Sequence, residues 1–223
     1  MADAGRVLIT GATGGAGGGV LAAFLDAGWR VAATSRREPP HEPPGVSWVR
    51  ADLVDAASAE RMVAATVAAL GGIDALVCLA GGYASAKLED LSWADFEGQI
   101  GTSLRPTVES VLAALPELRQ SDAGAIVTIG AQTALKPGRN AGPYAAAKAA
   151  VATWSLSLAA GLKASGVRVN CVLPGTLDTD ANRESMPGAK RDAWVAPRDL
   201  GNLIAWLCSP GSRPLTGTAI PIG

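Results

Sequence analysis

Seven short apolar segments, rich in β-branched residues, alternate with helical segments along almost the whole chain. The apolar segments are residues 6–10, 30–35, 46–52, 73–80, 124–130, 167–175 and 217–222. Continuous apolar runs of this length are typical of parallel strands that are covered on both faces. Repeated strand–helix–strand units therefore predict a doubly wound parallel α/β sheet of about seven strands, with helices on both faces. No linker or repeat interrupts the pattern, so we expect residues 1–223 to form a single domain.

Charge and composition give no reason to expect a macromolecular or membrane partner. Nineteen basic residues against 20 acidic ones leave a net charge of −1, too little to predict binding to nucleic acid or to an anionic membrane. The most apolar tract, 141–162, contains Lys148 and several hydroxyl side chains, and we interpret it as too polar to span a membrane. The chain begins with "MADAG" and enters its first strand without a targeting segment, so we expect a cytoplasmic protein.

The cysteines and the histidine predict no metal site. Cys78, Cys171 and Cys208 each lie in an apolar run without the spacing of a ligand pair, so we expect buried, reduced thiols. The single histidine, His41, lies in the proline-rich loop "EPPHEPPG". One isolated histidine cannot supply the ligand set that zinc requires.

A glycine-rich segment, "TGATGGAG" at residues 10–17, connects the first strand to the first helix. Gly11 allows a tight turn there, while Gly15 and Gly17 let a pyrophosphate approach the backbone at the helix N-terminus, where N–H groups favour anions. A flexible loop without a ligand is the alternative, but the position after the first strand favours dinucleotide binding. Thr13 and Gly14 of this loop are expected to contact the cofactor as well.

The end of the second strand indicates which dinucleotide is bound. NAD-binding sheets carry an acidic residue there for the ribose 2′-hydroxyl, whereas a basic residue accommodates a 2′-phosphate. This chain has Ser35 at that position, followed by Arg36 and Arg37. A guanidinium matches a phosphate in charge and in bidentate geometry. We therefore expect NADPH (or NADP+) rather than NADH, the alternative being two solvated loop arginines.

Tyr144 and Lys148 stand four positions apart in "GPYAAAKAA", a sequence of strong helix formers. Residues at this spacing share a helix face. The pair could be an ordinary surface contact. If it lies in a site, the Lys148 ammonium would lower the pKa of Tyr144 and make the phenol a general acid near neutral pH.

Three motifs, "TGATGGAG", "YAAAK" and "VLPGTLDT" (172–179), occur in the order and spacing of the short-chain dehydrogenase/reductase family, which the whole chain resembles. The resemblance implies a single Rossmann domain and hydride transfer between a nicotinamide and a small-molecule substrate. It implies that Tyr144 donates the proton and that Lys148 binds the nicotinamide ribose. The further cofactor contacts that it implies are Asp52 and Leu53 at the adenine, Ala80 and Gly81 at the ribose, and Pro174, Gly175, Thr176, Leu177 and Thr179 near the nicotinamide.

Two departures from the family pattern concern the catalytic centre. Ala131 stands where most members have a serine that hydrogen-bonds the substrate carbonyl, and Ser103 stands in place of an asparagine. Together with "CLAGGYA" and "VLPGTLDTDANRESMPGA", the alanine resembles the dihydropteridine reductase branch of the family. That branch reduces a quinonoid dihydropterin, an electrophilic imine that needs less polarisation than a ketone. The basic end of the second strand and Gly175 differ from the branch.

Alternative functions and substrate contacts follow from the same departures. The chain could be a general carbonyl reductase in which a water, Gln132 or Thr133 replaces the serine, or a non-catalytic NADP(H)-binding sensor. Tyr83 and Trp194 are candidates for stacking on a flat substrate. Arg183 is expected either near cofactor phosphate or substrate, or in an ion pair that anchors a short lid.

The helices around 103–119 and 143–163 are expected to form a homodimer or homotetramer interface, as the family resemblance implies. Val111 and Leu115 on the first helix, and Trp154 and Leu158 on the second, are interpreted as either dimer or core contacts.

Overall fold

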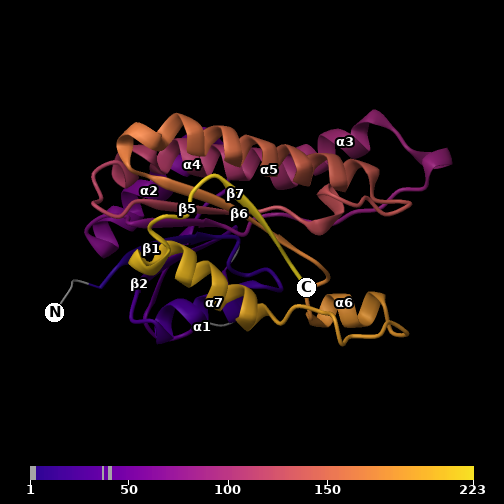
Figure 1. Cartoon of the computed structure of the whole chain (residues 1–223), viewed down its shortest axis with the longest axis horizontal. Helices are drawn as coiled ribbons and strands as arrows, with labels where there is room; N and C mark the ends of the chain where they lie inside the picture. Colours follow the sequence, from indigo (N-terminus) through magenta and orange to yellow (C-terminus); the bar gives the residue numbers. More distant parts are fainter. Residues whose placement is uncertain (1–3, 37, 40–41) are drawn as a thin grey trace.

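The strands form one parallel sheet in the order β3-β2-β1-β4-β5-β6-β7 (Figure 1). The computed structural model describes residues 4–36, 38–39 and 42–223, so the predicted contact Arg37 lies outside the described residues. The strands are β1 (Arg6–Thr10), β2 (Arg30–Ser35), β3 (Val46–Arg50), β4 (Ala75–Cys78), β5 (Ala125–Ile129), β6 (Arg168–Pro174) and β7 (Thr218–Ile222). The predicted doubly wound α/β fold is confirmed, and each strand lies within its predicted segment.

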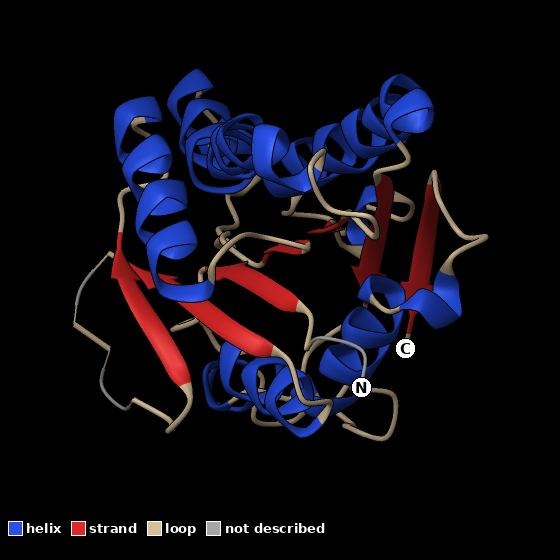
Figure 2. Cartoon of the chain, turned by 90° about the vertical axis from the view of Figure 1, so that its left-hand side faces the viewer, coloured by secondary structure: helices blue, strands red, loops and turns tan. Residues whose placement is uncertain are grey.

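Helices cover both faces of this sheet (Figure 2). α1 and α7 lie on one face, and α2, α4 and α5 lie on the other (Figure 1). The helices are α1 (Gly17–Asp26), α2 (Ala56–Leu70), α3 (Trp93–Gln99), α4 (Arg105–Leu118), α5 (Gly142–Leu162), α6 (Asp180–Ser185) and α7 (Pro197–Cys208). β1 pairs with both β2 and β4, so the direction of winding reverses at the carboxyl ends of β1 and β4, where such sheets bind their ligands.

Local sequence signals explain where several helices begin. The Asp55 carboxylate accepts hydrogen bonds from the backbone N–H groups of Ala57 and Ser58 at the start of α2, and Ser92 forms a capping box with Asp95 at α3. Such side chains satisfy N–H groups that have no partner within the helix. Pro143 occupies the first turn of α5, where its missing N–H costs no hydrogen bond.

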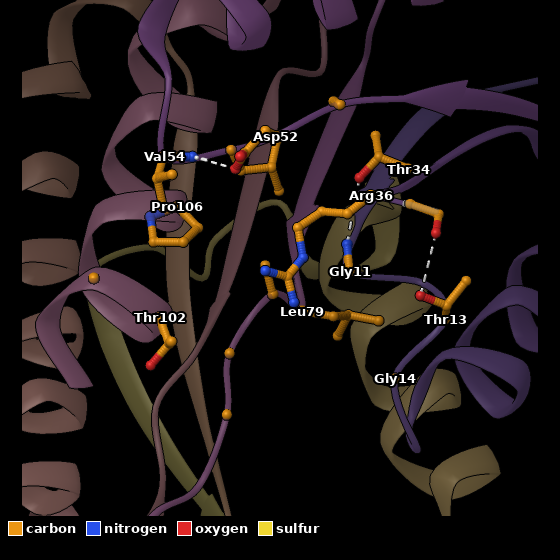
Figure 3. Close-up of a pocket in the computed structure, with 17 residues that line it drawn as sticks. Gly11, Thr13, Gly14, Thr34, Arg36, Asp52, Val54, Leu79, Thr102 and Pro106 are labelled. Carbon is orange, nitrogen blue, oxygen red and sulfur yellow. Dashed lines mark hydrogen bonds between the residues drawn. The ribbon is translucent and has the colours of Figure 1, made fainter. Parts of the chain in front are cut away.

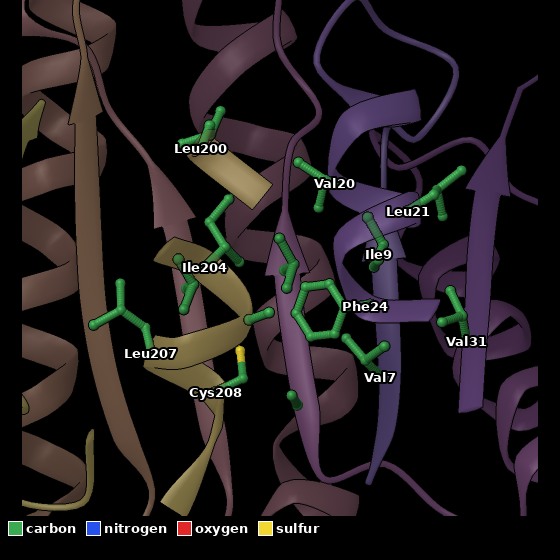
Figure 4. Close-up of a cluster of buried hydrophobic side chains, with 14 of the residues drawn as sticks. Val7, Ile9, Val20, Leu21, Phe24, Val31, Leu200, Ile204, Leu207 and Cys208 are labelled. Atoms are coloured by element: carbon green, nitrogen blue, oxygen red, sulfur yellow. The ribbon is translucent and has the colours of Figure 1, made fainter. Parts of the chain in front are cut away.

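Two apolar layers, one on each face of the sheet, hold the helices in place. On the α1 and α7 face, Phe24 packs among strand residues such as Val7 and Ile9 and helix residues such as Ile204 (Figure 4). The opposite layer joins the other sides of the strands to α2, α4 and α5. Fully buried side chains of this size each stabilise the fold by about 1.5–3 kcal/mol relative to exposure.

Side chains that the sequence assigned to a dimer or to the core belong to the second layer. Val111 is fully buried in it, and Leu115, Trp154 and Leu158 pack against it while partly exposed. The three cysteines are buried and unpaired, as predicted. Burial raises the pKa of the Cys78 and Cys208 thiols to about 12.

By length and composition alone, the segment Gly142–Ser165 is apolar enough to cross a membrane, so the prediction that this tract is too polar was wrong. The segment nevertheless packs along β6 and β5. Core helices of water-soluble proteins have the same composition, so this feature is weak evidence for a membrane.

Candidate active site

A pocket of about 350 Å³ lies at the carboxyl ends of β1, β2, β3 and β4, the position where the winding of the sheet reverses (Figure 3). It brings together many residues that the sequence predicted as cofactor contacts. These are Gly11, Thr13, Gly14, Ser35, Arg36, Asp52, Leu53, Ala80 and Gly81. Residues from four strands and the loops that follow them thus meet in one concave site, as dinucleotide binding at this edge requires.

The glycine loop could not keep its path with larger residues. Gly11 has a φ of +68°, and a Cβ there would lie 2.6 Å from the Ala80 backbone. A Cβ on Gly17 would overlap the carbonyl oxygen of Ala12. The loop leads into α1, whose N-terminus has no side-chain cap. The unused N–H groups of such a terminus favour an anion, so this loop fits a pyrophosphate.

The end of β2 presents a cation to the same pocket. Arg36 extends into the pocket between Asp52 on one side and Gly11 and Thr13 on the other (Figure 3). The Ser35 hydroxyl is buried, 3.5 Å from that of Thr13. Asp52 accepts a hydrogen bond from the Val54 backbone N–H at 3.2 Å. The position that bears a carboxylate in NAD-binding sheets therefore carries a hydroxyl followed by a guanidinium.

Sequence reasoning missed part of the pocket wall. Strand ends contribute Thr34 and Leu79, and the start of α4 contributes Pro106, preceded by Gly101 and Thr102 in a π-helical turn over Ile100–Leu104. The strand ends could have been found by extending the prediction to every strand that ends at this edge. The α4 residues carried no such signal, because their place depends on how the helix packs.

Lys148 is buried beside the pocket, with 5% of its surface exposed. Its ammonium group donates a hydrogen bond to the Ile129 carbonyl oxygen at 2.8 Å. A Cβ on Gly81 would lie 3.1 Å from Nζ, so the loop after β4 rests on the lysine. Burial lowers the pKa of Lys148 to about 8, partly offset by the nearby Cys171 and Cys78 thiols.

The predicted effect of Lys148 on Tyr144 is wrong in this structure. The pKa of Tyr144 is raised, first by burial and second by the neighbouring Tyr83 phenol. Tyr83 meets Tyr144 edge to face, with ring centroids 5.0 Å apart and planes at 76°. Spacing alone placed the lysine on the right helix face but could not show that its ammonium bonds to the Ile129 carbonyl.

Position 131 has no hydroxyl, and one predicted substitute is engaged elsewhere. Ala131 is buried after β5. The Gln132 side-chain N–H group donates hydrogen bonds to the carbonyl oxygens of Ile222 at 2.9 Å and Gly223 at 2.8 Å. The expectation that Gln132 replaces the serine is therefore not supported by its geometry. The buried Thr133 hydroxyl has no partner among the described residues.

Backbone hydrogen bonds fix the segment after β6, which ends at Pro174. Gly175 N–H donates to the Ile222 carbonyl oxygen, Thr176 accepts from Val195 N–H, and Leu177 accepts from the Asn182 side chain. Thr179 then caps α6 by accepting a hydrogen bond from Asn182 N–H at 3.3 Å. A Cβ on Gly15 would lie 2.9 Å from its methyl group, so Thr179 lies directly against the glycine loop.

Two candidates after Thr179 contact side chains of their own segment. Arg183 forms a bidentate ion pair with Asp178, at 2.7 and 2.9 Å, which is the lid-anchoring alternative. These hydrogen bonds hold the pKa of Asp178 below its usual value. The guanidinium of Arg191 lies over the Trp194 ring, 5.6 Å from the ring centroid. Within the described ranges, no cluster of three potential metal ligands occurs.

A glycine loop at the winding reversal of a doubly wound sheet, next to a tyrosine and a buried lysine, defines the class of NAD(P)-dependent oxidoreductases. The chain belongs to the short-chain dehydrogenase family, whose sequence profile, described as "short chain dehydrogenase", matches residues 5–190.

Relatives support this assignment. The chain is 33% identical to an L-rhamnose 1-dehydrogenase (NAD(P)(+)) of Azotobacter vinelandii, over 77% of this chain and 72% of that protein. It is 31% identical to a 2,3-dihydro-2,3-dihydroxybenzoate dehydrogenase of Escherichia coli, over 80% and 71%. The crystal structure of a 3-ketoacyl-(acyl-carrier-protein) reductase from Brucella melitensis with NADH superposes with a TM-score of 0.87 at 25% identity, covering 97% and 96% of the two chains. The protein is thus an NAD(P)-dependent oxidoreductase.

Proposed function

We propose that the protein is an NADPH-dependent reductase that acts on an activated C=N or C=O bond, with a quinonoid dihydropterin as a candidate substrate. The observation that carries the proposal is the Tyr144 and Lys148 pair beside a dinucleotide pocket, combined with an alanine at position 131. The pair supplies a proton donor and a cation, whereas the alanine removes a fixed donor to the substrate. A substrate that is already electrophilic needs that donor least.

The preference for NADPH is supported by the end of β2. Arg36 extends into the pocket near Asp52, and the preceding Ser35 presents no negative charge there. A guanidinium binds a 2′-phosphate through charge-assisted hydrogen bonds, whereas an NAD-specific site would place a carboxylate at this position.

The residues present fit the dinucleotide, and each has a distinct task. The glycine loop would hold the pyrophosphate, Asp52 and Leu53 would flank the adenine, and Lys148 would bind the nicotinamide ribose. The reduced nicotinamide supplies a hydride when it is bound. Tyr144 would protonate the substrate heteroatom. The Lys148 ammonium donates one hydrogen bond, to the Ile129 carbonyl oxygen, and the ribose hydroxyls would accept a further one.

The test is NADPH oxidation with a panel of substrates. Quinonoid dimethyldihydropterin and ethyl benzoylformate, an activated keto ester, should be reduced, whereas acetophenone should react at least tenfold more slowly because it needs more polarisation. Equal rates with acetophenone would favour a general carbonyl reductase. Tight NADPH binding without turnover of any substrate would refute the proposal and favour a non-catalytic sensor, although such a sensor would not need Tyr144.

We further propose that the chain forms a homodimer through α4 and α5, either alone or within a homotetramer. Leu112 on α4 and Leu156 on α5 are exposed, at 55% and 40%, although both helices pack their other sides on the sheet. A two-fold axis would bring identical faces together and bury these leucines. Sedimentation equilibrium distinguishes monomer, dimer and tetramer.

A further inference from the structure

Tyr83 lies against the proposed proton donor although it comes from a different part of the chain. It belongs to the loop between β4 and the short helix η1 (Leu88–Asp90), and its ring contacts Tyr144 edge to face at 5.0 Å. The side chain is 65% exposed, and the described residues provide no hydrogen bond to its hydroxyl. A phenol in this place can both shield the site and donate a hydrogen bond.

The loop that carries Tyr83 is held on both sides of this residue. Before it, Gly81 packs so closely that a Cβ would lie 3.1 Å from Lys148 Nζ and 3.7 Å from the Ser103 hydroxyl. After it, the Ala86 N–H donates a hydrogen bond to the Asn140 carbonyl oxygen at 3.1 Å, just before α5 begins. The loop is thus attached to the helix that bears Tyr144 and Lys148, which places Tyr83 beside the reacting groups.

The chain lacks a fixed second donor at the same place. Ala131 follows the strand whose Ile129 carbonyl accepts the Lys148 hydrogen bond, so position 131 lies near the pair but offers only a methyl group. The Gln132 amide is bonded to the C-terminal strand. Among the described residues, the Thr133 and Ser103 hydroxyls are also unpartnered. Both oxygens are buried, whereas Tyr83 is open to an incoming substrate.

We propose that the Tyr83 hydroxyl donates a hydrogen bond to the heteroatom of the bond being reduced, in the role that the missing hydroxyl at position 131 would otherwise have. This inference rests on the proposed reductase function. In the reduction, the substrate carbon gains the hydride that NADPH supplies as it is oxidised to NADP+, the heteroatom gains the Tyr144 proton, and the π bond between the carbon and the heteroatom breaks. Tyr83 keeps its own proton, and the Tyr144 phenolate regains one from solvent.

A donor on an exposed loop also accounts for the substrate class. Preorganised donors stabilise a developing negative charge best because they do not reorganise during the reaction. An exposed phenol must first be ordered by the substrate, so it polarises the bond less than a buried serine would. Substrates whose bond is already polarised would therefore be selected.

The test compares four proteins with NADPH and ethyl benzoylformate: wild type, Tyr83→Phe, Ala131→Ser and the double variant. Tyr83→Phe keeps the ring contact and removes only the hydroxyl. We expect kcat/KM to fall about tenfold, less than the hundredfold or more of a preorganised donor, with the Kd for NADPH unchanged. Ala131→Ser should restore most of the loss in Tyr83→Phe, and its effect there should exceed its effect in the wild type, a non-additive result that marks two residues serving one function.

Each outcome decides the question. Wild-type activity in Tyr83→Phe, or a loss that Ala131→Ser does not restore, would refute the role of the Tyr83 hydroxyl while leaving the reductase function intact. A large loss in Thr133→Val with normal Tyr83→Phe would assign the donor to Thr133 instead. If the wild type fails to oxidise NADPH in the presence of every activated substrate tested, the reductase function and this inference are refuted together.

Discussion

Lys148→Met should change how the stability of the protein depends on pH. Methionine has a similar length but no charge, so it fills the same buried space between the pocket and the sheet. Burial lowers the pKa of Lys148 from 10.5 to about 8. Between these two values the unfolded chain binds more protons than the folded one, and stability therefore rises with pH in this window because of this group.

The size of the effect follows from the shift. Each pKa unit corresponds to about 1.4 kcal/mol, so the buried ammonium destabilises the fold by up to about 3 kcal/mol below pH 8. Methionine relieves this cost but loses the hydrogen bond to the Ile129 carbonyl, which is worth about 1 kcal/mol at every pH. The free energy of unfolding of the wild type, relative to Lys148→Met, should rise by about 2–3 kcal/mol from pH 7 to pH 10.

Urea denaturation of both proteins without cofactor, at pH 7, 8, 9 and 10, measures this difference. Tyr144 and the buried thiols of Cys78 and Cys171 titrate in both proteins, so the comparison cancels most of their contribution. If the free energies of unfolding of the two proteins change in parallel with pH, or the wild type loses stability relative to the variant as the pH rises, Lys148 is not an ammonium that burial destabilises.

Three further substitutions test other parts of the site and surface. Arg36→Ala should raise the Kd for NADPH by about 10–100-fold, because it removes one charge-assisted hydrogen bond of about 1.5–3 kcal/mol, and should leave the Kd for NADH nearly unchanged. Equal affinities of the wild type for NADPH and NADH would contradict the assignment of Arg36. Gly11 has a φ of +68°, and a new Cβ there would lie 2.6 Å from Ala80, so Gly11→Ala should lower the free energy of unfolding in urea by about 1–2 kcal/mol or more and weaken NADPH binding. Gly18→Ala, where a Cβ would have no atom within 4 Å, should change neither. Equal losses of stability in the two variants would show that the turn is not the cause. Leu156→Glu should shift the sedimentation of the protein towards monomer, whereas Trp206→Glu on α7, across the sheet, should not; an unchanged assembly would place the interface elsewhere.

The position of the strands along the chain and the doubly wound parallel fold could be predicted from the sequence because each buried parallel strand needs a continuous apolar run. The same reasoning found the glycine loop, whose residues are fixed by steric limits at Gly11 and Gly17. Arg36 could be placed because it directly follows β2. These residues depend on local backbone geometry, which sequence patterns report well.

The environment of the catalytic pair could not be predicted in the same way. The pKa of Tyr144 depends on burial and on Tyr83, which is 61 positions away in the chain by the numbering. The Gln132 amide finds its partners at Ile222 and Gly223. Such contacts arise only when loops from several strands meet, and no periodicity or motif records them.

Transfer of a deuterium label tests the central claim most directly. Wild type and Tyr144→Phe are incubated with ethyl benzoylformate and NADPH that carries two deuterium atoms at nicotinamide C4, and the alcohol product is analysed by mass spectrometry. The account predicts one deuterium per product molecule in the wild type, and a rate of labelled product that falls by roughly 10²–10⁴ in Tyr144→Phe. Unlabelled product, or wild-type rates from the phenylalanine variant, would contradict it.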